Sequence, residues 1–152
     1  MRASPIPRRM LKIIIKNLQK KIPINPTRIK RLALSAVSRG DLHKTGELTV
    51  CFVNDSQIQT LNSRFLKIKK PTDVSAFKLN AKNEKFRADI IISAETALRN
   101  ATEFGTSPFF ELSLYVAHGI LHLRGYDDKT AKGKKQMYRR AVGILKNNGI
   151  LK

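Results

Sequence analysis

Residues 107–125 read SPFFELSLYVAHGILHLRG and predict a long helix that lies in the core of the protein. Ser107 followed by Pro108 is a typical helix start, because a missing N–H costs nothing in the first turn. Gly125 marks the end, since glycine adopts the left-handed backbone most cheaply. We therefore expect a helix that runs through Leu123, with the rest of the fold arranged around it.

The segments on either side of this helix predict further strands and helices. Apolar runs indicate strands near residues 11–18, 46–54, 73–79 and 89–93. Helical spacing, with Asn25-Pro26 and Asp55 as starts and Gly40 as a stop, indicates helices over about 26–40, 55–66, 94–104 and 129–147. This order predicts a single α+β domain over residues 1–152, with a mixed sheet of about four strands packed with helices and residues 1–9 as a loose basic arm.

The charge of the chain predicts a polyanionic partner. Thirty Lys and Arg face eleven Asp and Glu, for a net charge of +19, and such a chain repels itself unless a polyanion binds. RNA, DNA and an anionic membrane all qualify. Membrane is the weakest, because no apolar run approaches the length that spans a bilayer. Lys12 and Lys16 interrupt the first apolar run, which excludes a signal peptide there, and Cys51 has no disulfide partner, so we expect a cytoplasmic protein.

The end of the core helix carries the residues of a candidate metal site. His118 and His122 are four residues apart and therefore project from the same helix face. Gly125 can turn the chain back so that Asp128 supplies a third ligand. Three protein ligands leave one position open for water, as in catalytic zinc sites. The alternative is that the histidines are core residues and that Asp127 or Asp128 caps the last helix.

The same ligand spacing, with ligands at the first position, at +4 and at +10 and glycine at +7, occurs in one class of zinc proteases. Those enzymes place a glutamate directly after the first histidine as the general base. Here that position is Gly119, which has no group that could deprotonate water. A zincin-like spacing is therefore present, but peptidase chemistry is not supported.

Together with other blocks, this segment resembles the YbeY endoribonuclease family, the ribosomal RNA maturation factors of bacteria. The resemblance covers about residues 47–128. The supporting blocks are Leu61-Asn62 with Arg64, Pro71-Thr72-Asp73-Val74 with Phe77, Asp89-Ile90 with Ile92-Ser93, and Glu111-Leu112 leading into His118. The histidine motif is quite specific, whereas the other blocks would be weak alone.

The resemblance implies roles for individual residues. The two helical metal ligands of the family fall on His118 and His122. Its third ligand, normally histidine, falls on Asp128, whose carboxylate oxygen is a harder, anionic ligand. Arg64 matches an arginine that the family places beside the metal, where a guanidinium can hold two phosphoryl oxygens. A lesser departure is Ser75-Ala76, where the family usually has Leu-Ser, so that the hydroxyl would face the opposite side of a strand.

Basic residues gather in three parts of the chain. Residues 1–40 contain eleven Lys or Arg and no acid, a second cluster follows the candidate arginine, and the third lies in the last predicted helix. The second cluster, which we expect to bind RNA, consists of Arg64, Lys67, Lys69 and Lys70. The third consists of Lys129, Lys132, Lys134, Lys135, Arg139 and Arg140. Such contacts to phosphates give affinity without sequence readout.

These observations predict a metal-dependent, single-strand-directed endoribonuclease acting in ribosomal RNA maturation, as the resemblance implies. We expect one divalent transition metal, zinc first, and small-subunit ribosomal RNA or the small subunit itself as partner. Metal-activated water, water activated with help from Asp127, and a 2'-hydroxyl of the RNA remain alternative nucleophiles. The alternative function is a non-catalytic ribosome-assembly factor with a structural metal.

Overall fold

The structure of the chain, a computed structural model, describes residues 11–38, 45–65 and 74–152, and the side chains of residues 38 and 61–65 lie outside that description. The predicted arm of residues 1–9 and the helix end at Gly40 therefore lie outside it as well. The described elements follow the predicted order: β1 (Leu11–Asn17), α1 (Pro26–Ser38), β2 (Gly46–Val53), α2 (Asp55–Phe65), β3 (Val74–Lys78), β4 (Phe86–Ser93), α3 (Ala94–Phe104), α4 (Pro108–Leu123) and α5 (Ala131–Asn147).

The four strands form one mixed sheet in the order β1-β2-β4-β3. The first three of these strands are parallel, with Leu48 of β2 paired to Ile13 of β1 and to Ala88 of β4. Parallel neighbours need a crossover connection, which α1 provides between β1 and β2. The edge strand β3 is antiparallel to β4, to which a short turn joins it. The predicted mixed sheet of about four strands is confirmed.

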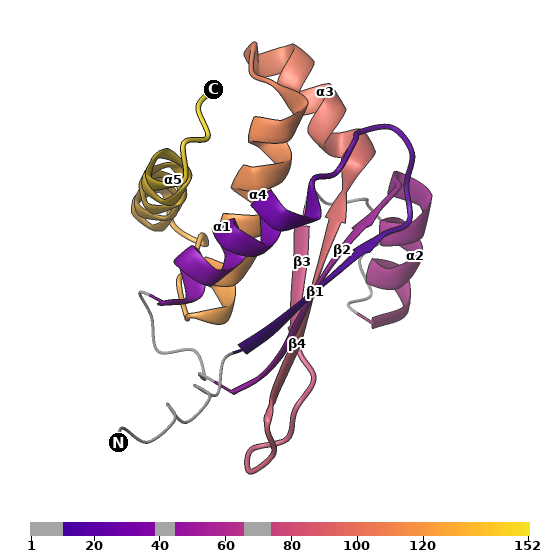
Figure 1. The fold of residues 1–152 in the computed structure, drawn as a ribbon, viewed down its shortest axis with the longest axis vertical. Helices are drawn as coiled ribbons and strands as arrows, with labels where there is room; N and C mark the ends of the chain where they lie inside the picture. Colours follow the sequence, from indigo (N-terminus) through magenta and orange to yellow (C-terminus); the bar gives the residue numbers. More distant parts are fainter. Residues whose placement is uncertain (1–10, 39–44, 66–73) are drawn as a thin grey trace, which may run out of the picture.

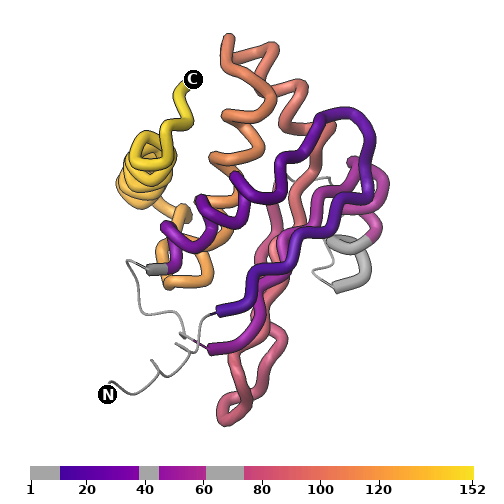
Figure 2. Tube along the Cα trace, in the orientation of Figure 1, coloured from indigo at the N-terminus to yellow at the C-terminus, as the bar shows by residue number. Residues whose placement is uncertain are grey.

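Helices cover the two faces of the sheet unequally. Figure 1 shows α1, α4 and α5 on one side of the sheet and α2 on the other. Because strand side chains alternate between faces, alternate positions of β2 and β4 form the main core with the larger helical layer: Leu48, Val50, Phe52, Ala88, Ile90 and Ile92. A smaller cluster on the opposite face joins the sheet to Ile58 of α2. The hairpin between β3 and β4 reaches beyond the helical layer (Figure 2).

Helix α4 is the central element of the main core, as its sequence predicts. It contacts α1, α3, α5, β3 and β4. Ser107 caps its first turn by accepting a hydrogen bond from the Phe110 N–H at 3.0 Å. The charged residue Glu111 is also buried, with only 3% of its surface exposed, and its carboxylate accepts a hydrogen bond from the Thr106 hydroxyl at 2.6 Å. The histidines near the end of α4 are therefore held on an element that is packed on several sides.

Two details of the predicted elements are corrected by the structure. The N-cap of α2 is Asn54 and not Asp55: the Asn54 side chain accepts a hydrogen bond from the Gln57 N–H at 2.8 Å, and the Gln57 side chain accepts one from the Asn54 N–H at 2.9 Å. The Asp55 carboxylate instead accepts hydrogen bonds from residues of β4 and α3. Strand β4 also begins earlier than predicted, at Phe86, because its pairing with β2 starts at Gly46.

Candidate metal centre

Three side chains converge at the C-terminal end of α4. The Nε2 atoms of His118 and His122 lie 3.1 Å apart. The Oδ2 atom of Asp128 lies 3.6 Å from each of them. The sequence-predicted triad thus comes together in space, and its three residues could hold a metal ion.

The backbone at the end of α4 brings Asp128 to the histidines. Gly125 adopts a positive φ of 97°, which glycine accepts without strain. The Gly125 N–H donates to the His122 carbonyl at 2.9 Å, and the Tyr126 N–H donates to the Leu121 carbonyl at 3.0 Å. These two bonds form a Schellman motif, which ends the helix and reverses the chain direction. The predicted role of Gly125 as the helix stop is confirmed.

The spacing of the three ligand atoms suits one tetrahedral transition-metal ion. Ligand bonds of about 2.0–2.2 Å at tetrahedral angles place neighbouring ligand atoms about 3.3–3.6 Å apart. The observed separations of 3.1 and 3.6 Å lie at or near the ends of that range. The side chains are between 27% and 36% exposed, so one side of the cluster faces solvent. A bound ion would therefore have an accessible fourth position.

Asp128 rather than Asp127 belongs to the cluster, a choice that the sequence leaves open. The Asp127 carboxylate points elsewhere and accepts a hydrogen bond from the Lys129 N–H at 2.7 Å. The interpretation that either aspartate caps the last helix is wrong. Thr130 is the N-cap of α5, and its hydroxyl accepts a hydrogen bond from the Gly133 N–H at 2.9 Å.

Gly119 faces the sheet at a point where no side chain fits. A Cβ atom at this position would lie 2.8 Å from Cγ2 of Ile90 on β4, closer than packed carbon atoms approach. A glutamate in the position that zinc proteases use for their general base would therefore collide with the sheet. Residue 119 therefore cannot supply the general base that those proteases place at this position.

Gly133 is a site-positioning residue that the sequence analysis missed. A Cβ atom here would lie 2.3 Å from the Asp127 carbonyl oxygen. The first turn of α5 can therefore lie against the loop that carries Asp128 only because residue 133 has no side chain. The signal in the sequence is weak, since a glycine in the first turn of a helix has several ordinary explanations.

The remaining predicted site residues are described only in part. Arg64 lies within α2, but its side chain is outside the described residues, as are Lys67, Lys69 and Lys70. Ser75 is buried and by strand alternation faces the same side as Phe77, toward the α2 cluster. Ala76 packs against the main core instead. The hydroxyl of this strand therefore faces away from the helical layer that contains α4.

Cys51 is buried, as predicted, and burial raises the pKa of its thiol more than the nearby Lys16 lowers it. A thiol with a raised pKa is mostly protonated near neutral pH and reacts slowly. Cys51 is thus a core residue and takes no part in the candidate centre.

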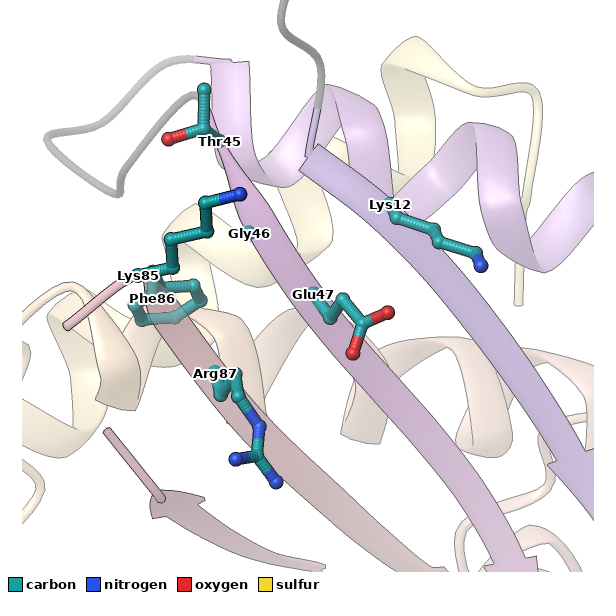
Figure 3. Close-up of a pocket in the computed structure, with 7 residues that line it drawn as sticks. All are labelled: Lys12, Thr45, Gly46, Glu47, Lys85, Phe86 and Arg87. Atoms are coloured by element: carbon teal, nitrogen blue, oxygen red, sulfur yellow. The ribbon is translucent and has the colours of Figure 1, made fainter.

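A separate surface pocket of about 640 Å³ lies at the starts of β1, β2 and β4 (Figure 3). Its charged side chains are Lys12, Glu47, Lys85 and Arg87. Glu47 is paired in register with both Lys12 and Arg87, so opposite charges alternate across the strands. None of the three candidate ligands lines this pocket.

Comparisons with known proteins support the fold and show the family of the chain. The family model described as endoribonuclease YbeY matches residues 14–149. The endoribonuclease YbeY of Desulforamulus reducens is 34% identical over 91% of this chain and 97% of its own length. That of Geobacter metallireducens is 33% identical over 93% of this chain and 100% of its own. A solution structure of a Thermotoga maritima protein superposes with a TM-score of 0.60 at 26% identity, covering 90% of this chain and 88% of that one. Because the family model and these relatives extend over most of the chain, the protein belongs to the endoribonuclease YbeY family.

Proposed function

We propose that this protein is a metal-dependent endoribonuclease whose metal is held by His118, His122 and Asp128. The observation that carries the proposal is the convergence of these ligand atoms, all within 4.8 Å of one another, in a chain of an endoribonuclease family. The ligand spacing along the chain is zincin-like, with the second and third ligands four and ten residues after the first. Two imidazole nitrogens and a carboxylate oxygen suit a divalent transition metal, and zinc is our first choice.

The residues of the site would divide the chemistry of phosphodiester cleavage. A bound divalent metal supplies Lewis acidity toward a phosphoryl oxygen and acidifies water. The Nε2 atoms of His118 and His122 lie on a packed helix and would therefore fix the position of the metal ion. Asp128 adds a negative charge that His in the same place would not, which makes the centre less electrophilic. The exposed side of the cluster would admit the RNA strand.

Arg64 and the cations that follow it complete the proposed site. A guanidinium at Arg64 would stabilise the charge that develops on the phosphoryl oxygens during cleavage. Lys67, Lys69 and Lys70 would hold neighbouring phosphates without reading the bases. These assignments rest on the family resemblance and on the sequence order of the cluster.

We further propose that the substrate is small-subunit ribosomal RNA, either free or assembled in the small subunit. The protein would act on it in the cytoplasm. The net charge of +19 supports a polyanionic substrate. The described helices are all too short or too polar to cross a bilayer. Nothing in the described residues favours the non-catalytic assembly-factor alternative.

Paired aspartate variants test the proposed centre. Asp128→Asn should lower metal affinity at least tenfold and abolish RNA cleavage, because it removes the charge of one ligand. Asp127→Asn is the matched control: it removes the same charge one residue away and keeps the oxygen that accepts the Lys129 N–H. Elemental analysis and cleavage of a single-stranded RNA are the measurements. Equal metal content and cleavage in both variants would refute the assignment of Asp128.

A further inference from the structure

We infer that the outward face of α5 is a second RNA-binding surface, which holds phosphates of a single strand on its cations and stacks a base on Tyr138. That the polyanion is RNA rests on the proposed function. Helix α5 lies at the outer edge of the helical layer (Figure 1). One face is buried through Met137, Ala141, Ile144 and Leu145, so the other is free to bind a partner.

The exposed face of α5 carries charge of one sign only. The helix contains six Lys or Arg and no Asp or Glu, and no acid follows it to the end of the chain. Among the described residues, no salt bridge joins any of these cations to a carboxylate. Unneutralised cations on one helix raise the local concentration of phosphate groups and release counterions when they bind.

The hollows along α5 form a continuous track that begins at the loop between α4 and α5. A pocket of about 390 Å³ on that loop shares Lys132 and Gln136 with a pocket of about 570 Å³ on the helix. The latter shares Lys135 and Arg139 with a third pocket, of about 650 Å³, which extends to Lys146. Lys132 and Lys146 are fourteen residues apart, a distance of about 21 Å at the helical rise. The same loop carries Asp128, so the track adjoins the segment that supplies the third candidate ligand.

Tyr138 gives this track an aromatic surface. Its large side chain is 47% exposed, and it lines the same pocket as Lys135 and Arg139. A flat ring beside phosphate-binding cations is the combination with which proteins hold single-stranded nucleic acid, because every base has a face that can stack. The recognition would be independent of sequence.

Other occupants fit this face less well. A helix that lies on a membrane inserts an apolar face, but the apolar face of α5 is already buried in the protein. The pocket at the starts of β1, β2 and β4 has three cations, yet Glu47 lies among them. Asp127 lines the loop pocket at one end of the track, but α5 itself carries no acid, so the helix favours a polyanion more than the pocket at the strand starts does.

Two triple variants of equal charge test the inference. The first replaces Lys132, Lys135 and Arg139 by Gln; the control replaces Lys12, Lys85 and Arg87 by Gln. The probe is a labelled single-stranded RNA of mixed sequence, titrated by fluorescence anisotropy over a range of salt, with its integrity checked on a gel. The α5 variant should bind at least tenfold more weakly, and its slope of log affinity against log salt should be smaller by about 2. Equal losses in both variants, or none in the first, would overturn the inference.

Variants of Tyr138 test the stacking contact separately. Tyr138→Ala should weaken RNA binding about fivefold or more without changing the salt slope, because stacking releases no counterions. Tyr138→Phe keeps the ring and should bind like the wild type. Equal affinity of all three proteins would remove the stacking contact from the proposal.

The same variants separate this inference from the proposed function and from membrane binding. Normal metal-dependent cleavage together with unchanged RNA affinity in the α5 triple variant would refute the surface alone. RNA binding through α5 in a wild-type protein that cleaves nothing with any metal would refute the nuclease and support the surface. Loss of binding to phosphatidylserine vesicles, with RNA affinity unchanged, would assign the face to a membrane and overturn the inference.

Discussion

The Asp55 carboxylate joins the start of α2 to the start of α3. It accepts hydrogen bonds from the hydroxyls of Ser93 and Thr96 and from Arg99, the latter two at 2.9 and 2.6 Å. Burial raises the pKa of Asp55, but the hydrogen bonds from Arg99, Ser93 and Thr96 lower it more, so its pKa lies below that of a free aspartate. The ionised form is therefore the one that stabilises the fold.

We predict that Asp55→Asn lowers the free energy of unfolding at neutral pH by about 1–3 kcal/mol. Because the folded pKa lies below the unfolded value of about 3.9, the contribution of Asp55 is complete above that pH and is lost as the pH falls through the folded pKa. Urea unfolding of wild type and variant should therefore differ less at about pH 3 than at about pH 7. The exposed Glu103 on α3 supplies the control variant Glu103→Gln. A difference that stays constant with pH would contradict the role of the charge.

Gly133 offers a test of how the loop with Asp128 is positioned. Gly133→Ala should displace the Asp127 carbonyl, which would lie 2.3 Å from the new Cβ atom. We expect metal affinity to fall about tenfold or more, as when support for a ligand is removed. Gly143→Ala, on the same helix but with nothing within 4 Å of a Cβ atom, should leave metal affinity unchanged and raise stability by about 1 kcal/mol. Unchanged metal affinity in Gly133→Ala would exclude this positioning role.

At the scale of elements, the packing of α4 on β4 determines how far His118 and His122 lie from the sheet. Gly119 lets the helix backbone approach Ile90, while His118 and His122 lie on a half-exposed side of the same helix. A close-packed interior has few voids into which side chains can move. If α4 shifts, the elements packed against it must therefore shift as well. A shift of α4 against the sheet would therefore move His118 and His122 together.

We predict that Gly119→Ala lowers the free energy of unfolding by about 1–3 kcal/mol, because its methyl group would overlap Ile90. Ile90→Ala destabilises by itself through the cavity that it leaves. The double variant should lose less than the sum of the two single variants, since the smaller side chain makes room for the methyl group. Denaturant unfolding of all four proteins measures this coupling. Strict additivity would show that the two residues do not compete for space.

At the scale of the whole molecule, the net charge of +19 is the dominant property. Cations that repel one another destabilise the compact state, and salt screens that repulsion over a distance of about 10 Å at 0.1 M. Polyanion binding would provide the same relief. Cations far from the candidate centre would therefore favour polyanion binding, because that binding would relieve their mutual repulsion.

We expect the Tm of the protein to rise by a few degrees when the ionic strength increases from about 10 mM to about 200 mM. The triple variant of α5 carries a net charge of +16 in place of +19 and should show a smaller rise. Thermal unfolding followed by circular dichroism is the measurement. A Tm that falls with salt would mean that attractive ion pairs outweigh the repulsion.

The order and type of the elements were predictable from local chemistry. Helix α4 begins at Ser107-Pro108 and ends before Gly125, as expected, because helix caps and backbone preferences depend on only a few neighbouring residues. The mixed sheet followed from the order of strands and helices. The family and its class of activity were predicted from the histidine motif and its neighbouring blocks, and the comparisons confirm them.

Choices between neighbouring residues required the tertiary structure. Asp127 and Asp128 are chemically identical in sequence, and only the path of the chain after Gly125 brings Asp128 within 3.6 Å of both histidines. Asp55 looks like a helix cap until α3 brings Thr96 and Arg99 beside it, which leaves the cap to Asn54. Gly119 and Gly133 likewise owe their roles to atoms of other segments. Contacts between segments distant in sequence depend on how whole elements pack, and no local pattern records that packing.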